Sequence, residues 1–143
     1  MRRGFTLTEI LVLLGLFAAF ACLAFVIFNP TEEFSRARNI HRWSDLNKIS
    51  QAISTYDSLN DGKILSSLPN MPEEICVSGD CDKLFDLSIL VKNKYMDEIP
   101  KDPLCASECK TLGSGYFISK DKIGHIVLRA GLAELKESIA VLR

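Results

Sequence analysis

The sequence has little net charge, few histidines and no internal repeat. Its 143 residues carry 17 lysines and arginines against 18 aspartates and glutamates, a formal net charge of −1. A dedicated nucleic-acid binder normally shows a clustered basic excess, so this balance gives no strong nucleic-acid signal. Only two histidines are present, His41 and His125, and no nucleophile motif accompanies them. We therefore expect neither an enzyme nor a bound cofactor.

Charge is also nearly absent from one long segment close to the N-terminus. Residues 5–28 contain a single charged side chain, Glu9, whereas residues 31–143 carry 15 basic and 17 acidic groups. The uncharged run 10–28 approaches the roughly 20 apolar residues that a membrane-spanning helix needs. Arg2 and Arg3 precede it, and basic residues beside a span favour the cytoplasmic side. The sequence predicts a membrane anchor with the rest of the chain outside.

A cleaved signal peptide combines basic and apolar residues in the same order. Its apolar region is normally about 7–15 residues long and ends in a small-residue cleavage site. Here the run is longer and ends at Asn29-Pro30 without such a site, and the formal match at Ala19-Phe20-Ala21 lies in mid-run. We expect the helix to stay on the protein.

Glu9 requires an explanation, because an acid in mid-bilayer costs about 2.5–3.5 kcal/mol on insertion scales and less near an interface. It closes the string Gly4-Phe5-Thr6-Leu7-Thr8-Glu9, which follows the two arginines. This string resembles the processing site of type IV prepilins and type II secretion pseudopilins. The resemblance implies a leader at residues 1–4, cleavage between Gly4 and Phe5 by a prepilin peptidase, and methylation of the new amino terminus.

The same resemblance implies a role for Glu9 in assembly. In that family the amine of the mature first residue, here Phe5, is thought to pair with the glutamate of a neighbouring subunit. The two charges attract strongly in low dielectric and each is costly alone, so the pair would fix the register of a filament. The alternative is an interfacial carboxylate that reaches headgroup water. Implied partners are this chain and other pilins, prepilin peptidase, a membrane platform with its assembly ATPase, and lipid.

A second helix is predicted beyond the membrane segment, with a bend at Asn29-Pro30 and Thr31 as its cap. Asn60-Asp61-Gly62 signals its end. Arg42 and Asp45 fall mostly off its apolar stripe, which comprises Ile40, Trp43, Leu46, Ile49, Ile53 and Tyr56.

We therefore predict an α+β, pilin-like fold. Its long bent N-terminal helix, with a membrane half and an amphipathic half, would pack on a small antiparallel sheet. Residues 5–28 form the transmembrane or filament-core helix. Residues 29–143 form the helix continuation, to about residue 60, and a globular head.

Within the head the patterns predict mostly loop over 63–79, a short helix within 82–94, and strands at 116–119 and 123–129. Residues 130–143 are ambiguous: their apolar spacing favours a short helix or an irregular end, whereas pilin heads often close with another strand. The stretch from Tyr95 to Pro103, read as Y-x-x-x-I-P-x-D-P, resembles a segment that precedes the sheet in many pilin heads. Asp97, Glu98 and Asp102 are interpreted as a solvated acidic face.

Five cysteines occur, of which Cys22 lies in the apolar segment and is expected to pack as a small apolar side chain. The other four lie in the predicted exterior, where an even number suggests disulfides with three possible pairings. Closeness in sequence favours Cys76–Cys81 and Cys105–Cys109. A four-cysteine zinc site is the alternative, although the C-x4-C and C-x3-C spacings are looser than usual.

A calcium loop is suggested by Asp57, Asn60, Asp61 and Gly62, but their spacing does not match D-x-[DN]-x-[DN]-G. We predict no metal site. The function implied by the resemblance is a structural subunit of a type IV pilus-like filament, held in the cytoplasmic membrane with its N-terminus inside and its head outside. After assembly the filament would be extracellular or periplasmic. The alternatives are a type II secretion pseudopilin, or a single-pass anchored exterior binding domain that does not polymerise.

Overall fold

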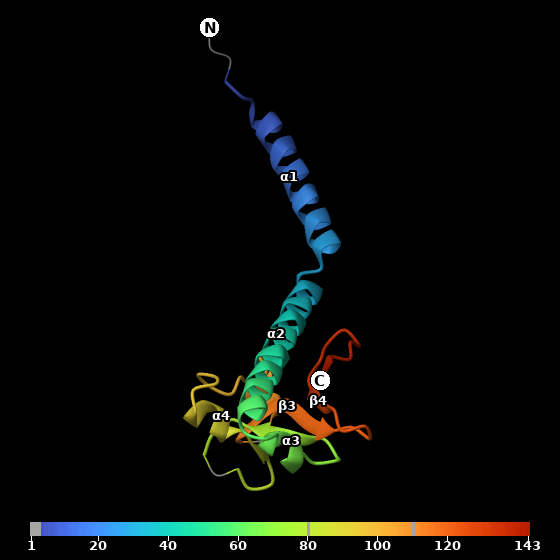
Figure 1. Ribbon diagram of the computed structural model, residues 1–143. Helices are drawn as coiled ribbons and strands as arrows, with labels where there is room; N and C mark the ends of the chain where they lie inside the picture. The colour runs from blue at the N-terminus through green and yellow to red at the C-terminus, as the bar shows by residue number, and fades with distance from the viewer. Residues whose placement is uncertain (1–3, 80, 110) are drawn as a thin grey trace. The chain divides into compact units, whose positions relative to one another are not determined.

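The computed structural model describes residues 4–79, 81–109 and 111–143, and its class is α+β (Figure 1). The chain divides into two compact units, one ending at Ser35 and the other running from Arg36 to Arg143. A long helical N-terminal region precedes a small mixed sheet, which agrees with the predicted class.

The N-terminal region contains two consecutive helices, α1 (Leu7–Phe28) and α2 (Pro30–Leu59). They are interrupted at Asn29, whose backbone is left-handed with φ 32°. Pro30 opens α2, where its missing N–H costs nothing because the first amides of a helix have no intrahelical acceptor. Asn29, and not Thr31, caps α2: its carbonyl accepts from the Glu32 amide at 3.0 Å. Thr31 instead donates its hydroxyl to the Asn29 side chain at 2.9 Å.

The second unit contains a five-stranded sheet in the order β2-β1-β3-β4-β5. The strands are β1 (Glu73–Cys76), β2 (Phe85–Asp86), β3 (Gly113–Lys120), β4 (Ile126–Ala130) and β5 (Ala140–Leu142). All neighbours are antiparallel except β1 and β2, which run parallel over two residue pairs. The expected purely antiparallel sheet is therefore wrong at one edge, where a short loop after Cys76 returns the chain in the same direction.

The predictions for three single segments have mixed outcomes. Residues 63–79, predicted as mostly loop, contain a helix, α3 (Lys63–Ser67), as well as β1. The short helix predicted within 82–94 is confirmed as α4 (Ser88–Lys92), although Phe85–Asp86 in the same stretch forms β2. At the C-terminus residues 131–139 are irregular, and Ala140–Leu142 form β5. The predicted short helix is wrong, because pairing with β4 satisfies backbone groups that an edge strand would leave open. The remaining short helix, α5 (Cys105–Glu108), follows the two prolines at Pro100 and Pro103.

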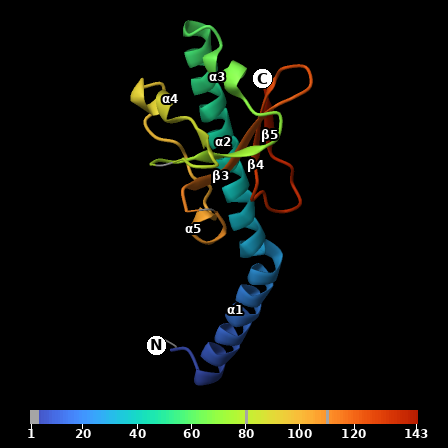
Figure 2. The same cartoon turned by 90° about the horizontal axis from the view of Figure 1, so that it is seen from below.

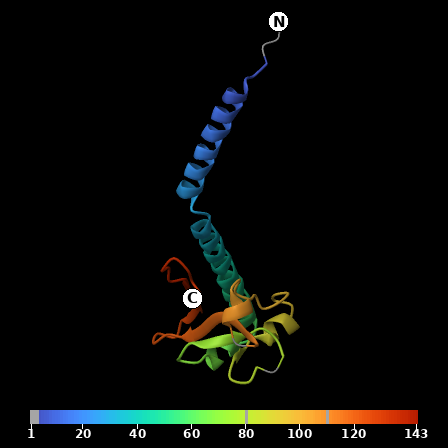
Figure 3. The ribbon, with the colours of Figure 1, turned by 180° about the vertical axis from the view of Figure 1, so that it is seen from behind.

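The core lies between α2 and one face of the sheet, and α2 crosses the sheet in Figures 2 and 3. From α2 it takes Leu46, Ile49, Ile53 and Tyr56; from the strands it takes Ile75, Tyr116, Ile118 and Leu128. Tyr56 also meets Tyr95 edge to face, with ring centroids 5.4 Å apart. This contact fixes the start of the Tyr95–Pro103 segment against α2.

Candidate functional site

The side chains of α1 are exposed from Leu7 to Ile27, although most are large and apolar. Phe17 and Phe25, for example, are 77% and 75% exposed. A helix that is apolar on all sides is stable only inside a bilayer or among other apolar helices. In the described part of the chain, the helical region containing α1 is the one long and apolar enough to cross a membrane. The surface that completes α1 must come from outside this chain.

Glu9 is held in a capping box at the start of α1. Its carboxylate accepts from the Thr6 amide at 3.1 Å and from the Thr6 hydroxyl at 3.2 Å. The Glu9 amide in turn donates to the Thr6 hydroxyl at 3.3 Å. Thr-x-x-Glu is the known pattern for this arrangement, so the sequence contained a signal for a second, purely local role of Glu9. Any assembly role must be separated from this capping.

The predicted processing residues lie beside Glu9 and are accessible. Phe5 is 73% exposed, and Gly4, Phe5, Thr6 and Glu9 line a shallow open depression. A Cβ added at Gly4 would meet nothing within 4 Å. No contact within the described chain therefore requires glycine at this position. The remainder of the predicted leader, residues 1–3, lies outside the described residues.

The second unit buries a polar cluster that we call the Arg42 cluster: Asn39, Arg42, Asp102 and Glu134. The Arg42 side chain is fully buried and donates to Asp102 through Nε at 2.7 Å and Nη2 at 3.1 Å. Its Nη1 donates to Glu134 at 2.9 Å and to Asn39 at 2.7 Å. Burial by itself would lower the pKa of the Arg42 guanidinium, but these carboxylate hydrogen bonds outweigh it, and the pKa is raised.

The Arg42 cluster corrects two predictions. The first part of the proposed apolar stripe faces solvent, since Ile40 is 66% and Trp43 40% exposed. Arg42 occupies the buried face instead, because two carboxylates from distant segments lie opposite it. Asp102 is likewise not part of a solvated acidic face, whereas Asp97 and Glu98 are exposed as predicted.

Asp45 forms a second buried polar site one turn further along α2. It accepts a hydrogen bond from the Tyr116 hydroxyl at 2.8 Å, and His41 Nδ1 and Lys48 Nζ lie 3.0 and 3.3 Å from its oxygens. Burial, followed by the hydrogen bond to Asp45, raises the pKa of Tyr116 far above its ordinary value. Tyr116 thus stays a neutral donor to a buried carboxylate.

A tight turn between β4 and β5 is held by the Arg42 cluster. Its central residues, Leu135 and Lys136, both have left-handed backbones, with φ 56° and 59°, and the Glu137 amide donates to the Glu134 carbonyl at 3.0 Å. Asn and Gly are the residues preferred at such a pair of positions, since other residues pay about 1–2 kcal/mol each there. Arg38 donates two hydrogen bonds, of 2.7 and 2.6 Å, to the Glu134 carboxylate. Asn39 donates to Glu137 at 3.0 Å.

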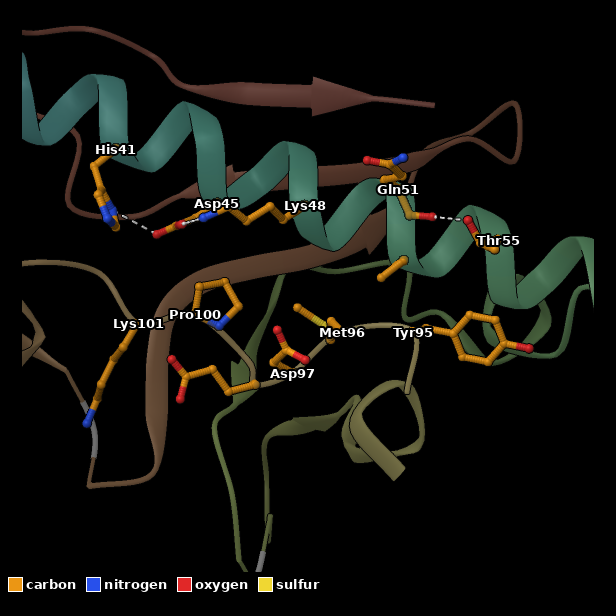
Figure 4. A pocket seen from close by; sticks show the side chains of 12 residues that line it. His41, Asp45, Lys48, Gln51, Thr55, Tyr95, Met96, Asp97, Pro100 and Lys101 are labelled. Atoms are coloured by element: carbon orange, nitrogen blue, oxygen red, sulfur yellow. Dashed lines mark hydrogen bonds and ion pairs between the residues drawn. The ribbon is translucent and has the colours of Figure 1, made fainter. Parts of the chain in front are cut away.

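A groove of about 720 Å³ separates α2 from the segment that follows α4 (Figure 4). Its apolar surface comes from Ala52, Tyr95, Met96 and Pro100. Its charged lining has both signs, with Asp97 and Glu98 as acids and Lys48 and Lys101 as bases. His41 points towards Asp45 at one end, and Thr55 lies beside Tyr95 at the other (Figure 4). This groove was not predicted from the sequence, because its two walls are at least forty residues apart along the chain.

The four cysteines of the second unit form two disulfides, Cys76–Cys81 and Cys105–Cys109, with Cα atoms 5.7 and 4.7 Å apart. This is the pairing that closeness in sequence favours. Gly115 of β3 has φ +77°, and a Cβ there would come within 2.8 Å of the Cys105 sulfur. Glycine at this position therefore lets β3 pass close to the second disulfide. Cys22 is a free, exposed thiol on α1.

Asp57, one of the residues considered as a calcium ligand, accepts hydrogen bonds at the start of α3. Its carboxylate accepts from the amides of Ile64 at 2.8 Å and Leu65 at 3.0 Å, and so caps α3. Asn60 donates back to the Tyr56 carbonyl at 2.8 Å. Among residues 4–79, 81–109 and 111–143, no three His, Cys, Asp or Glu side chains are grouped as metal ligands.

Comparison of the chain with protein-family models, with curated proteins and with solved structures gives no match.

Proposed function

We propose that this protein is a structural subunit of a type IV pilus-like filament, without catalytic activity of its own. The observation that carries the proposal is the combination at the N-terminus: Gly4-Phe5 directly before an apolar helix whose first turn bears the single acid Glu9. Cleavage after Gly4 by a prepilin peptidase would create an amine on Phe5, four residues before that acid. Leu7–Phe28 would then form the membrane helix before assembly and the filament core afterwards.

The exposure of α1 supports this role. An apolar helix with no cover inside its own chain can be stored in lipid, with the head on the exterior side, and later transferred among identical helices. The cationic amine of an incoming subunit would be costly among such helices unless a carboxylate neutralised it. Glu9 is the only acid in residues 5–28 that could do so. A platform protein and an ATPase would supply the work of extraction from the membrane.

The decisive experiment compares Glu9→Gln with Glu9→Leu. Glutamine can still form a capping box with Thr6, whereas leucine cannot; both substitutions remove the charge. If Glu9 sets the assembly register, both variants insert into the membrane but yield far fewer sheared filaments than wild type. Thr6→Val is the matched control, because it removes the hydroxyl of the capping box and leaves the charge of Glu9. It should assemble.

Normal filament yield from Glu9→Gln together with loss in Glu9→Leu would assign Glu9 to helix capping alone and reject the register role. Processing is tested separately by mass spectrometry of the mature N-terminus. A chain that begins at N-methyl-Phe5 supports the proposal, and replacing Gly4 with a bulky residue should leave the precursor uncut. An intact Met1 would favour the anchored exterior domain. A secretion pseudopilin would share the processing but would not build long surface filaments at native expression.

A further inference from the structure

The turn Glu134–Glu137 presents its two central side chains outward. Leu135 is 41% exposed and Lys136 is exposed, while the flanking Glu134 and Glu137 are fixed by Arg38, Asn39 and Arg42. Leu135 and Lys136 are poor choices for two consecutive left-handed positions. Strain that the surroundings hold in place is typical of functional positions. A turn built only for stability would carry Asn-Gly there.

The groove between α2 and the Tyr95–Pro103 segment has the complementary chemistry. Its apolar surface, from Ala52, Tyr95 and Met96, suits a leucine side chain. Two lysines, Lys48 and Lys101, also line the groove, but Lys48 lies 3.3 Å from the buried Asp45, so Asp97 and Glu98 leave an acidic excess that suits a lysine. In the described residues, Asp97, Glu98 and Lys136 make no side-chain hydrogen bond or ion pair within their own chain. A volume of about 720 Å³ lies in the range of clefts that hold small ligands.

The turn and the groove lie on opposite sides of α2. In Figures 1, 2 and 3 the C-terminal turn, drawn in red, and the segment after α4, drawn in gold, are always separated by the helix. A chain therefore cannot fill its own groove with its own turn. Because the two surfaces differ, each copy that docks its turn leaves its own groove free for the next copy, which gives a head-to-tail series that stays open unless its rotation closes a ring.

We propose that the Leu135–Lys136 turn of one copy docks into the Ala52–Met96 groove of a second copy. Leu135 would contact Tyr95 and Met96, and Lys136 would pair with Asp97 and Glu98. This inference deepens the proposed function and rests on it. It adds a specific head-to-head contact to the helix packing, so that the heads as well as the N-terminal helices select their neighbours.

Thiol cross-linking of the full chain in membranes tests the contact directly. Two differently tagged copies are co-expressed in a Cys22→Ser background, one carrying Leu135→Cys and the other Thr55→Cys, a groove position. Mild oxidation should link the two tags about tenfold more than in a control pair in which Ser44→Cys replaces Thr55→Cys. Ser44 is exposed on α2 but lies outside the groove. Equal linkage in the two pairs would overturn the proposal.

Charge exchange tests the specificity of the contact. Lys136→Glu should lower filament yield or, in the cross-linking pair, lower linkage by about fivefold, because like charges then face each other. Combining Lys136→Glu with Glu98→Lys in every copy should restore most of the loss. If the double variant is no better than the single one, the proposed pairing of Lys136 with the groove is wrong.

Replacing Leu135-Lys136 by Asn-Gly separates folding from docking. These residues suit the left-handed backbone, so the head should unfold at a higher temperature while filament yield falls. A more stable head with unchanged assembly would show that the turn is only structural. The cross-linking result does not depend on processing or on filaments. Linkage without N-terminal cleavage would therefore reject the pilus assignment while keeping the contact between copies.

Discussion

The two long helices of this chain arrange polarity in opposite ways. In α1, apolar side chains such as Phe17 and Phe25 face outward on every side, and nothing in the described chain covers them. In α2, Arg42 is fully buried while its neighbour Ile40 is 66% exposed. Both arrangements look wrong for a helix in water. Each becomes reasonable once the surface opposite the helix is considered.

For α1 the opposite surface is external. Burying a single leucine is worth about 1.5–3 kcal/mol, so a helix with this many exposed apolar residues strongly favours lipid or other helices over water. For α2 the opposite surface is internal and polar. Asp102 and Glu134 supply oxygens that match the guanidinium fork of Arg42, which offsets its desolvation. The comparison shows that the partner, and not the hydrophobicity of a residue, decides which side of a helix is buried.

The largest expected effect comes from removing the buried cation of α2. Arg42→Met leaves the buried Asp102 carboxylate without its main partner, and we expect a loss of about 3–5 kcal/mol in unfolding free energy. Ile40→Ser, two positions away on the exposed side, should change stability by less than about 0.5 kcal/mol. Denaturant unfolding of the full chain in detergent, followed by the fluorescence of the single tryptophan Trp43, measures both. A larger loss for Ile40→Ser would contradict the assigned orientation of α2.

Introducing a charge into the apolar helix α1 should cost a comparable free energy, but in membrane insertion and not in folding. Leu16→Arg places a cation in the middle of the apolar helix and should disfavour membrane insertion by about 2.5–3.5 kcal/mol. The head should fold unchanged, because α1 belongs to the other compact unit. Leu16→Met is the conservative control. Membrane fractionation measures insertion, and a thermal melt of the head measures folding. A destabilised head would contradict the conclusion that α1 depends only on surfaces outside the chain.

The sequence was sufficient to predict features that depend on neighbouring residues. The end of α2 near Asn60 and the strand region after Gly113 follow from turn chemistry and local alternation. The apolar character of α1 follows from composition alone. Glu9 stands out because an acid in such an apolar segment is unusual. Its capping box with Thr6 also has a sequence signal, the Thr-x-x-Glu pattern.

What could not be predicted depends on pairs far apart in the chain. Arg42 is buried because residues 60 and 92 positions away face it, and no local pattern reports that. Ile40 fits the apolar spacing of α2, but no other part of the described chain packs over it. Phe85–Asp86 became a strand within a helical pattern because β1 offered an open edge, and the C-terminal residues became β5 for the same reason at β4.

Tyr116, a buried residue of β3, tests a second polar contact on the buried side of α2, its hydrogen bond to Asp45. Tyr116→Phe removes the hydroxyl that donates to Asp45, and we expect a loss of about 1.5–3 kcal/mol at neutral pH, the usual range for a hydrogen bond to a charged group. Because the pKa of Tyr116 is raised in the folded state, the native protein keeps a proton that the unfolded chain releases near pH 10. Its contribution is complete below that pH and falls by about 1.4 kcal/mol per unit above it.

Unfolding of wild type and Tyr116→Phe is therefore compared between pH 8 and 11. The stability difference should be constant up to about pH 10 and shrink above it, since the variant lacks the titrating group. Other lysines and tyrosines titrate in both proteins and cancel in the difference. A difference that grows with pH would mean that Tyr116 is not held neutral beside Asp45.

Removing the disulfides tests how much these covalent cross-links, which α1 lacks, contribute to the unfolding free energy of the head. Each closes a ring of only a few residues, so the loop-entropy model predicts about 2 kcal/mol for Cys105→Ser with Cys109→Ser. Cys76→Ser with Cys81→Ser should cost a similar amount, which makes each pair a control for the other. In wild type, alkylation without reduction should label none of the four, and chelators should leave the melting temperature unchanged. Reactive thiols after chelation would instead indicate zinc.

The smallest effect is expected at Asp121, a partly exposed acid in the turn between β3 and β4. Its carboxylate accepts from the His125 amide at 2.8 Å and the Ile123 amide at 2.9 Å, and these bonds, that of His125 first, lower its pKa. Because the folded-state pKa is depressed, Asp121 stabilises the hairpin above its unfolded pKa of about 3.9, and this contribution is lost as pH falls through the folded value.

Asp121→Asn retains one acceptor oxygen but removes the charge, so its melting temperature should lie slightly below that of wild type at pH 6. The two should converge below pH 3, where the wild-type carboxyl is protonated. Glu108→Gln, at an exposed acid on α5 with no such amide contacts, serves as the control for general charge removal. A deficit in Asp121→Asn that persists at pH 2 would show that geometry, and not the charge of Asp121, holds the turn. Asp121 would then stabilise the turn through its shape alone.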